Sequence, residues 1–400
     1  MPYAAQRFLL FTLLFTIVGC NSERKMREVD AVIVEAQRLF APDRRTTVCD
    51  VQARIESGKL TLTGEMQSAR LRNQFVQYVA EKTGLPIVDS LQVLPQPSLK
   101  GNTYGVVSVS VASIRSNPGH AKELATQALL GTPLRVLKKE GGWYYVQTPD
   151  DYLGWMDDGF ERMDQSSFEA WANREKLIVM TNYATTHRLP DRNSDIVGDV
   201  VAGCILGVLK DDKAFYQVEY PDGRKAFLPK ESAQPYRKWL ARAQDTPATI
   251  VATAKRFFGV PYLWGGTSPK AMDCSGFTKT VYFLNGVLLP RDASQQAEVG
   301  NVVEVQHGFE NLQAGDLLFF GSKATDKKKE RVTHVGLYLG NMKFIHESED
   351  VHINSLNRDD PDFSEFRFDM FLHARRIIGA GKQTGVRRLL EIPYYRGNEF

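Results

Sequence analysis

Apolar residues in the first hundred positions switch between helical spacing and strict alternation. A helical set precedes KLTLTGEM, in which apolar and polar residues alternate as on a half-buried strand, and a second helical set follows. The prolines of PQPSLKGN then interrupt regular structure. The pattern predicts the order helix, strands, helix, strand for a small α/β domain over residues 21–97. The two helical faces carry Val29, Val32, Ile33, Ala36 and Leu39, and Leu71, Phe75, Tyr78 and Val79.

A repeat occupies the middle of the chain. GTPLRVLKKEGGWYYVQTPDDYLGWM from Gly131 aligns without gaps with GCILGVLKDDKAFYQVEYPDGRKAFL from Gly203. Each copy has short alternating strands, a turn that contains an aspartate, and an aromatic residue after it, which is typical of a small β-barrel. We therefore predict two copies of one barrel, over residues 104–163 and 177–236, joined by a helical connector near QSSFEAWANRE.

The last third of the chain begins with helical spacing and continues with strand-like alternation. Thr246 can cap a first helix, and Pro247 suits its first position. A second helix after a glycine-rich turn places Asp273 and Cys274 at its amino end, and GDLLFFG, THVGLYLG and MKFIHES are predicted strands. The pattern predicts an α+β domain over residues 245–378 and an extension over residues 379–400. The helical faces carry Ile250, Val251, Ala254, Phe257 and Phe258, and Phe277, Val281 and Leu284.

Composition and charge narrow the class of protein. A chain of 400 residues, of which 43% are hydrophobic and 24% charged, is long enough for several globular domains. The 50 basic and 47 acidic side chains nearly cancel, which argues against a nucleic-acid partner. Two of the four cysteines, Cys49 and Cys204, lie in segments predicted to be separate domains. We expect both to be buried free thiols, with a disulfide between them as the alternative.

Residues 1–20 differ from the rest of the chain. MPYAAQRFLLFTLLFTIVGC has one arginine, an apolar run that is short for a membrane span, and a small-residue end, as in a secretory signal peptide. The last four residues resemble the bacterial lipobox, in which the cysteine receives diacylglycerol. This resemblance implies lipidation of Cys20 and a protein anchored to a membrane in the cell envelope, outside the cytoplasm. A plain signal peptide with an incidental cysteine is the alternative.

Cys274 and two histidines carry the candidate chemistry. A thiol attacks as thiolate, which the amino end of a helix and a nearby imidazole both favour. If the strands of THVGLYLG and MKFIHES pair through a turn at Gly340 and Asn341, His334 and His346 lie on one surface. His334 is then placed to accept the thiol proton, and His346 to orient His334. A buried core cysteine and a zinc site are the alternatives, but Cys274 lacks a second ligand at paired spacing, and we expect no metal and no cofactor.

Six strings in this part of the chain resemble one family. PYLWGG, DCSGF, LPRDASQQ, AGDLLFF, THVGLYLG and FIHES resemble the NlpC-type cell-wall cysteine peptidases, in that family's order, over residues 247–377. The resemblance implies a papain-like fold with Cys274 as nucleophile, His334 as general base and His346 as the orienting residue. The two barrels resemble bacterial SH3-like domains, and the first domain resembles the small BON-type domains of envelope proteins. The expected fold class is thus α+β, with four such domains.

The combination with two SH3-like domains resembles the γ-D-glutamyl-L-diamino acid endopeptidases. These hydrolyse the bond between γ-D-glutamate and the diamino acid in peptidoglycan stem peptides that carry a free amino-terminal L-alanine. The resemblance implies that Glu123 and Tyr152 help to hold the alanine ammonium, and a carboxylate pair such as Glu123 and Asp273 suits that charge. A non-catalytic wall-binding lipoprotein, and an amidase or acyltransferase acting on another amide, are the alternatives. The full set of implied substrate-binding residues is Tyr262, Trp264, Asp273, Ser275, Ser294, Glu123 and Tyr152.

Overall fold

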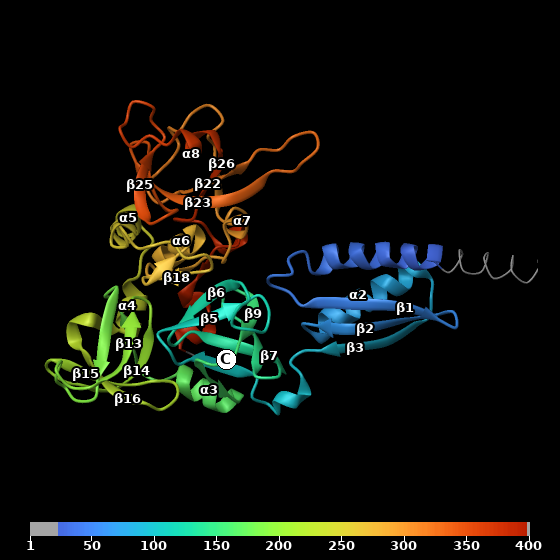
Figure 1. The fold of residues 1–400 in the computed structure, drawn as a ribbon, viewed down its shortest axis with the longest axis horizontal. Coiled ribbons are helices and arrows are strands. Elements are labelled where there is room, and N and C mark those ends of the chain that lie inside the picture. The colour runs from blue at the N-terminus through green and yellow to red at the C-terminus, as the bar shows by residue number, and fades with distance from the viewer. Residues whose placement is uncertain (1–22, 398–400) are drawn as a thin grey trace, which may run out of the picture. The chain divides into compact units, whose positions relative to one another are not determined.

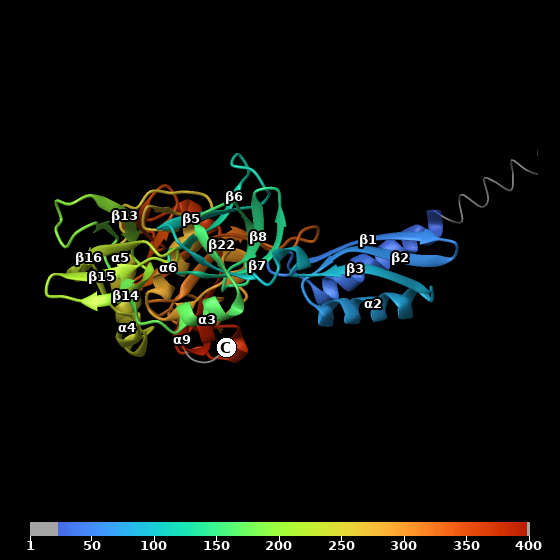
Figure 2. The ribbon, with the colours of Figure 1, turned by 90° about the horizontal axis from the view of Figure 1, so that it is seen from below.

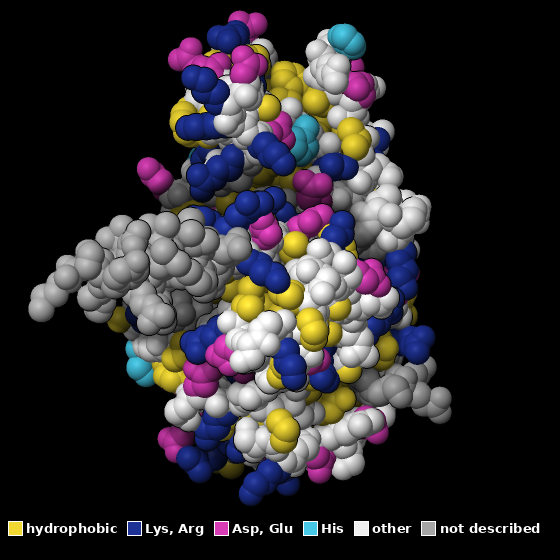
Figure 3. Space-filling model, turned by 90° about the vertical axis from the view of Figure 1, so that its right-hand side faces the viewer, with side chains coloured by type: hydrophobic (Ala, Val, Ile, Leu, Met, Phe, Trp, Pro, Cys, Tyr) yellow, Lys and Arg dark blue, Asp and Glu magenta, His cyan; other side chains and the backbone are white. Residues whose placement is uncertain are grey.

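The computed structural model describes residues 23–397, in two compact units divided between Leu99 and Lys100 (Figure 1). Each unit is described by itself. The predicted signal segment and Cys20 lie outside the described residues. Within residues 23–397, none of the helices is long and apolar enough to cross a membrane. Side chains of Lys and Arg and of Asp and Glu both occur over the face shown in Figure 3, as the near balance of charge leads one to expect.

The first unit has the predicted order of elements. Residues 23–40 are helical, and β1 (Cys49–Glu56), β2 (Lys59–Met66), α2 (Ala69–Thr83) and β3 (Ile87–Val93) follow (Figures 1 and 2). The strands form one sheet in the order β1-β2-β3, with the first pair antiparallel and the second parallel. Both helices pack against the sheet through a common core that includes Ile33, Leu62 and Phe75.

The ends of the elements in this unit follow their local chemistry. The Ser68 side chain accepts a hydrogen bond from the Leu71 amide and caps α2, which ends at Gly84 in the left-handed conformation. The prediction that Leu39 lies on the buried face is wrong, because its side chain is 58% exposed. Phe40, the last helical residue, packs on the core instead.

The two copies of the repeat fold with the same topology. Each forms a seven-stranded sheet, in the orders β10-β4-β7-β8-β9-β5-β6 and β17-β11-β14-β15-β16-β12-β13, which are identical once the strands of each copy are numbered from its own start. The connector between them is α3 (Gln165–Ala172), capped by Asp164. The strands are β4 (Tyr104–Val107), β5 (Val111–Arg115), β6 (Leu124–Leu129), β7 (Pro133–Glu140), β8 (Trp143–Gln147), β9 (Leu153–Met156), β10 (Phe160–Met163), β11 (Lys176–Val179), β12 (Tyr183–His187), β13 (Ile196–Val201), β14 (Ile205–Asp211), β15 (Phe215–Glu219), β16 (Lys225–Pro229) and β17 (Ala233–Pro235).

Helices precede a six-stranded sheet in the last part of the second unit. The sheet order is β21-β26-β22-β23-β24-β25. The helices are α4 (Tyr236–Arg242), α5 (Pro247–Lys255), α6 (Cys274–Phe283), α7 (Ala293–Gln296) and α8 (Glu365–Asp369). The strands of the sheet are β21 (Asn301–Val303), β22 (Leu317–Ser322), β23 (Arg331–Gly340), β24 (Lys343–Glu347), β25 (Val351–Ser355) and β26 (Phe371–Arg376). Short pieces complete the chain: β18 (Thr267–Ser268), β19 (Ala271–Met272), β20 (Val287–Leu288), β27 (Arg387–Arg388), α9 (Pro393–Arg396), η1 (Pro97–Leu99), η2 (Lys230–Ser232), η3 (Lys382–Thr384) and η4 (Leu389–Glu391).

The first helix of this part begins as predicted and ends earlier. Thr246 caps α5 in a capping box with Thr249, and proline occupies the first turn. Ile250 and Phe257 are fully buried, whereas Phe258 is 61% exposed, so its predicted place on the buried face is wrong. The helix ends at Lys255, and the turn toward Gly259 directs the Phe258 side chain outward.

The pairing of β23 with β24 sets the two faces of the sheet. The strands are antiparallel and are joined by a tight turn in which Asn341 and Met342 both have positive φ. Val335, Leu337 and Ile345 pack on the side of α5 and α6. Tyr338 and Phe344 pack on the opposite side, in a second core.

The C-terminal extension connects parts of the second unit. β27 pairs with β20, and the Arg387 guanidinium binds the Asp151 carboxylate at 2.7 Å. The Tyr394 hydroxyl accepts a hydrogen bond from the Trp171 indole (3.2 Å) and donates one to the Gly131 carbonyl (2.8 Å). The extension therefore packs on the first copy of the repeat and on its connector.

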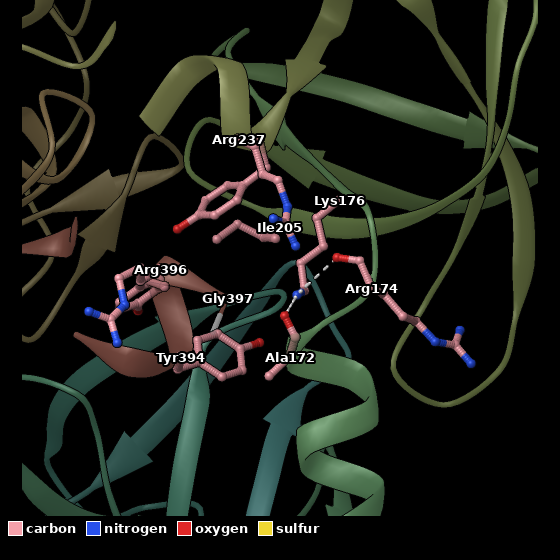
Figure 4. Close-up of a pocket in the computed structure, with 10 residues that line it drawn as sticks. Ala172, Arg174, Lys176, Ile205, Arg237, Tyr394, Arg396 and Gly397 are labelled. Carbon is pink, nitrogen blue, oxygen red and sulfur yellow. Dashed lines mark hydrogen bonds between the residues drawn. The ribbon is translucent and has the colours of Figure 1, made fainter. Parts of the chain in front are cut away.

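Lys176 of β11 lies between the end of α3 and Tyr394 of the extension (Figure 4). Its ammonium donates to the carbonyl oxygens of Ala172 and Arg174 at the end of α3, while Tyr394 lies 5.6 Å from it, measured to the ring centre. Burial lowers the pKa of Lys176 to about 7. Because its partners are orphan carbonyls of a helix end, the side chain has a capping role.

Candidate active site

The first turn of α6 holds Cys274 against a glycine-rich loop. The Asp273 side chain accepts a hydrogen bond from the Gly276 amide at 2.8 Å and so caps the helix, which begins at Cys274. A side chain at Gly276 would place its Cβ 2.0 Å from the Gly266 carbonyl oxygen, so this position needs glycine. The Cys274 side chain is buried at the amino end of α6, as predicted.

The two predicted histidines contact each other. The His334 Nε2 and His346 Nδ1 atoms lie 2.8 Å apart. In the register of the two strands, His346 lies opposite Gly336, two residues beyond His334 on the same face. A Cβ at Gly336 would lie 3.2 Å from the Cβ of His346, so the glycine leaves room for the imidazole.

A fourth side chain fixes the direction of the hydrogen bonds. The Asn354 amide nitrogen donates to the Asp362 carbonyl at 3.4 Å, and its Oδ1 therefore faces His346 Nε2, at 2.9 Å. His346 Nε2 must carry the proton in that contact, which leaves its Nδ1 to accept from His334 Nε2. The Nδ1 atom of His334 then holds the free electron pair that a general base needs.

Asn354 was not identified from the sequence. The signal was present in VHINS, because alternation along β25 puts His352 and Asn354 on the same face. In the register with β24, His352 lies opposite His346 and Asn354 opposite Phe344. A polar residue two positions after a candidate orienter is a weak signal, and only the register of the sheet gives it meaning.

The cysteine and the base are both neutral at rest. Burial, with the charge of Asp273, raises the pKa of Cys274 to about 12, while a hydrogen bond from the Val335 amide opposes that shift. This amide follows His334 directly in β23, so the sulfur lies at the strand that carries the base. Burial also lowers the pKa of His334 well below its ordinary value. Attack by the sulfur must therefore be accompanied by proton transfer to an imidazole.

Asp273 and Ser275, both predicted to contact substrate, are engaged within the protein. Arg291 forms a buried two-point ion pair with Asp273, at 3.0 and 2.5 Å, and also donates to the Ser275 hydroxyl at 2.9 Å. Although burial alone would lower the pKa of Arg291, the Asp273 carboxylate raises it above its ordinary value. Arg291 Nε donates to Thr126 of β6 at 3.0 Å, which ties the helix cap to the first copy of the repeat.

The loop before α6 presents two aromatic residues at the surface. Burial and the charge of Cys274 raise the pKa of Tyr262 to about 12, so its hydroxyl stays protonated. Trp264 is 62% exposed, and its indole nitrogen donates to the Glu123 carboxylate at 2.8 Å. Glu123 belongs to the first copy of the repeat, so the structure brings these two predicted residues together across parts of the second unit.

Tyr152 also reaches the cysteine-bearing part. Its hydroxyl donates to the Asp292 carboxylate, at 3.1 Å to one oxygen and 3.3 Å to the other. Asp292 caps α7, in whose first turn the predicted Ser294 lies half-buried. Asp292 stands in the string LPRDASQQ, but sequence reasoning gave it no role, since nothing local indicates a partner 140 positions away.

Glu347, like Asn354 and Asp292, is a feature that the sequence did not reveal. Its side chain is fully buried, and neither carboxylate oxygen has a hydrogen-bond partner within the described chain. Burial, with the charges of Asp350 and Asp273, raises its pKa to about 8. A carboxyl group in this position is protonated at neutral pH.

Cys274 thus contacts the strand that carries His334, the first member of the hydrogen-bonded chain His334, His346 and Asn354. Cys49 and Cys204 are buried free thiols, as predicted, and burial raises the pKa of Cys49 to about 11. In residues 23–397, no group of three histidine, cysteine, aspartate or glutamate side chains is arranged to hold a metal ion.

Comparison with known proteins agrees with this geometry. The model of the NlpC/P60 family matches residues 259–365, and that of the bacterial dipeptidyl-peptidase Sh3 domain matches residues 114–159. A γ-D-glutamyl-L-lysine dipeptidyl-peptidase of Bacillus cereus is 36% identical over 235 residues, which are 57% of this chain and 68% of that protein. Dipeptidyl-peptidase 6 of Lysinibacillus sphaericus is 28% identical over 64% of this chain and 93% of its own length.

A solved structure extends the likeness to three dimensions. The crystal structure of an NlpC/P60 family protein from Bacillus cereus has a TM-score of 0.58 and 28% identity, and the match covers 68% of this chain and 99% of that one. This chain therefore belongs to the NlpC/P60 family of cysteine peptidases, and it carries an SH3 domain of the bacterial dipeptidyl-peptidase type.

Proposed function

We infer that this protein hydrolyses the amide bond between γ-D-glutamate and the diamino acid of peptidoglycan stem peptides whose amino-terminal L-alanine is free. The observation that carries this inference is the meeting of Glu123 with Trp264 and of Tyr152 with Asp292. These contacts support the inference, because they join Glu123 and Tyr152 of the first SH3-like domain to Trp264 and Asp292, which lie near Cys274 in the sequence. Relatives named for γ-D-glutamyl-L-lysine dipeptidyl-peptidase activity support the same reaction.

The catalytic cycle uses one thiol and one imidazole. The Cys274 sulfur attacks the γ-glutamyl carbonyl while His334 Nδ1 takes the thiol proton. The tetrahedral oxyanion is held by a backbone amide at the start of α6 and by the protonated hydroxyl of Tyr262. His334 then gives its proton to the departing amine, which leaves a thioester on Cys274. Water, deprotonated by His334, hydrolyses the thioester and restores the thiol.

His346 and Asn354 act as positioning residues in this cycle. Each hydrogen bond of the chain from Asp362 to His334 has a defined donor, so the relay keeps His334 in the tautomer with a free Nδ1. When His334 becomes an imidazolium, His346 Nδ1 still accepts from it. The relay thereby lowers the free energy of the charged intermediate.

We assign the alanine ammonium to Glu123, Tyr152 and Asp292. Asp273 was the expected second carboxylate, but Arg291 neutralises it in the buried ion pair. Asp292 carries the Tyr152 hydroxyl and supplies a carboxylate instead. An ammonium between two carboxylates is favoured by charge, whereas an acylated alanine loses that charge and gains bulk. Trp264 would form a wall of this site, and Ser275 and Ser294 remain proposed contacts for the substrate's carboxylate and backbone.

The other parts of the chain have proposed roles in placement. The shared strand order of the two sheets supports a second SH3-like domain over residues 177–236 beside the first over residues 104–163. We assign residues 21–97 to a BON-like domain, residues 245–378 to the peptidase domain and residues 379–400 to the extension. The family implies a location outside the cytoplasm. Lipidation of Cys20 would hold the protein at a membrane of the cell envelope.

Mass spectrometry of defined peptides tests the function. We expect the purified protein to release L-Ala-D-Glu from L-Ala-γ-D-Glu-diamino acid and to leave the N-acetylated peptide uncut. Cys274→Ala should abolish release, while Cys49→Ala, which removes a buried thiol in the other unit, should not. Binding without turnover by the wild-type protein would contradict the peptidase assignment. Equal cleavage of the acetylated peptide would contradict the ammonium site.

A further inference from the structure

A short helix brings a cation to the end of the sheet where His334 lies. α8 directly precedes β26, and the Gly321 amide donates to the Met370 carbonyl at 2.8 Å. That contact anchors the end of α8 beside the end of β22, where Phe320 pairs with His334. Arg367 is the central residue of α8.

The Arg367 guanidinium rests on two aromatic rings. Its central carbon lies 5.9 Å from the ring centre of Phe320 and 5.2 Å from that of Phe366. The Phe320 ring in turn lies 5.7 Å from the His334 ring. The side chain is half-buried, and within residues 23–397 its guanidinium forms neither an ion pair nor a hydrogen bond.

Three other arginines in this part of the chain have carboxylate partners. Arg291 pairs with Asp273, Arg376 with Asp316 at 2.8 Å, and Arg388 with Asp245 at 2.7 Å. A guanidinium taken partly out of water without a carboxylate has lost hydration that the ring contacts replace only in part, and no carboxylate among residues 23–397 pairs with it. A ligand anion would replace it.

The charge of Arg367 acts on the catalytic side chains. After burial, it is the next cause of the low pKa of His334, and it also lowers that of His346. In the other direction, the Cys274 thiolate opposes the fall in the pKa of Arg367 that burial causes. The positive charge of Arg367 makes His334 a weaker base. A role of Arg367 in substrate binding would compensate for this loss of basicity.

The proposed reaction identifies the anion. The departing amine must lie at His334, which protonates it, so the diamino acid occupies the side of the site on which Arg367 stands. In a stem tripeptide the α-carboxylate of this residue is two bonds from the departing nitrogen, and diaminopimelate carries another carboxylate at the end of its side chain. We propose that Arg367 holds a carboxylate of the departing diamino acid, a role that rests on the proposed function.

The geometry of the guanidinium suits this role. Its planar fork binds a carboxylate through two parallel hydrogen bonds, and the aromatic rings beneath it limit its orientations. Binding would also reduce the effect of the positive charge on His334, so the base becomes stronger once the correct leaving group is in place. Arg367 is thus a residue that couples leaving-group recognition to proton transfer.

Matched peptides separate the two carboxylates. The substrates are L-Ala-γ-D-Glu-L-Lys, the same peptide with a carboxamide at its C-terminus, and L-Ala-γ-D-Glu-diaminopimelate with its α-carboxyl amidated. We expect Arg367→Met to lower kcat/KM about 10- to 100-fold for peptides that carry the carboxylate it holds, as for the loss of hydrogen bonds to a charged group. Peptides without that carboxylate should change less than about threefold, and Arg367→Lys should restore part of the loss.

The control is Arg358→Met. Arg358 is exposed and stacks on Phe363 and Phe368 of the same region, at 5.4 and 4.8 Å, so its loss perturbs similar packing away from the catalytic side chains. A loss with the first peptide alone assigns the α-carboxylate, and a loss with the third alone assigns the side-chain carboxylate. Equal losses with every peptide, or none, would overturn the proposal. If the wild-type protein cuts no peptide, the proposed function itself has failed.

Discussion

Replacing Glu347 by glutamine should change how stability depends on pH. The wild-type carboxyl is fully buried, both of its oxygens lack partners in the described chain, and its pKa is raised from 4.5 to about 8. The unfolded chain ionises this group above its ordinary pKa, while the folded chain keeps it protonated. The folded protein is therefore stabilised by the proton below pH 4.5, and this stabilisation is lost as pH rises toward 8.

The size of the effect follows from the two pKa values. The shift from 4.5 to about 8 corresponds to roughly 5 kcal/mol between the limits, at about 1.4 kcal/mol per pH unit. Between pH 5 and pH 8 the linkage relation gives a loss of roughly 3.5 kcal/mol in the free energy of unfolding, which Glu347→Gln should not show. The buried amide adds a cost of its own, but that cost does not depend on pH.

Denaturant unfolding of the second unit measures this difference. All five tryptophans follow Lys100, so their fluorescence reports on that unit. Unfolding curves of the wild type and the variant are compared at pH 5, 6.5 and 8. Glu349→Gln is the matched control, because Glu349 is an exposed carboxylate two residues away. Parallel pH dependence in the wild type and Glu347→Gln would refute the reasoning.

Three further substitutions test the site. Asn354→Leu should lower kcat about 10- to 100-fold with little change in KM, as for other residues that orient a histidine. Nitrogen NMR should show that the tautomer of His334 changes in this variant. The control variant Asn354→Asp should keep most of the rate. Gly336→Ala should displace His346 and lower kcat while circular dichroism stays unchanged, because the new Cβ meets Phe344 at 3.0 Å and His346 at 3.2 Å; a full rate would show that the relay tolerates the methyl group. Lys279→Met should destabilise the second unit by about 3–5 kcal/mol, because the buried Asp150 carboxylate then loses the Lys279 ammonium that lies 2.5 Å from it. Thermal unfolding of Lys279→Met, compared with that of the double variant Lys279→Met/Asp150→Leu, measures this cost.

Local pattern was enough to predict the elements that bear the chemistry. The spacing around Cys274 predicted a helix that begins there, and alternation predicted that His334 and His346 share a face. The repeat predicted one topology used twice, and the strand orders agree. The helix start and the shared face depend on near neighbours along the chain, and the repeat transfers one topology to the second copy whatever its long-range pairs are.

Long-range pairing could not be predicted in the same way. Asp273 was expected to face an ammonium, yet it pairs with Arg291, and Tyr152 and Trp264 find their partners about 140 positions away. Side chains at helix ends, such as Leu39 and Phe258, were misplaced because the pattern does not show where the helix stops relative to the core. Glu347 was missed because a carboxylate is ordinarily exposed, and only packing shows otherwise.

Arg291 links the helix start at Cys274 to the first SH3-like domain. Its guanidinium holds the Asp273 cap that starts α6 at Cys274, and its remaining nitrogen donates to Thr126 of the first SH3-like sheet. The first SH3-like domain also contains Glu123 and Tyr152 of the proposed ammonium site. A buried cation needs all of its partners, so separating the SH3-like part would leave Arg291 with an unpaired donor beside the nucleophile. The placement of Cys274 therefore depends on its contact with the SH3-like domain that carries the residues of the proposed ammonium site.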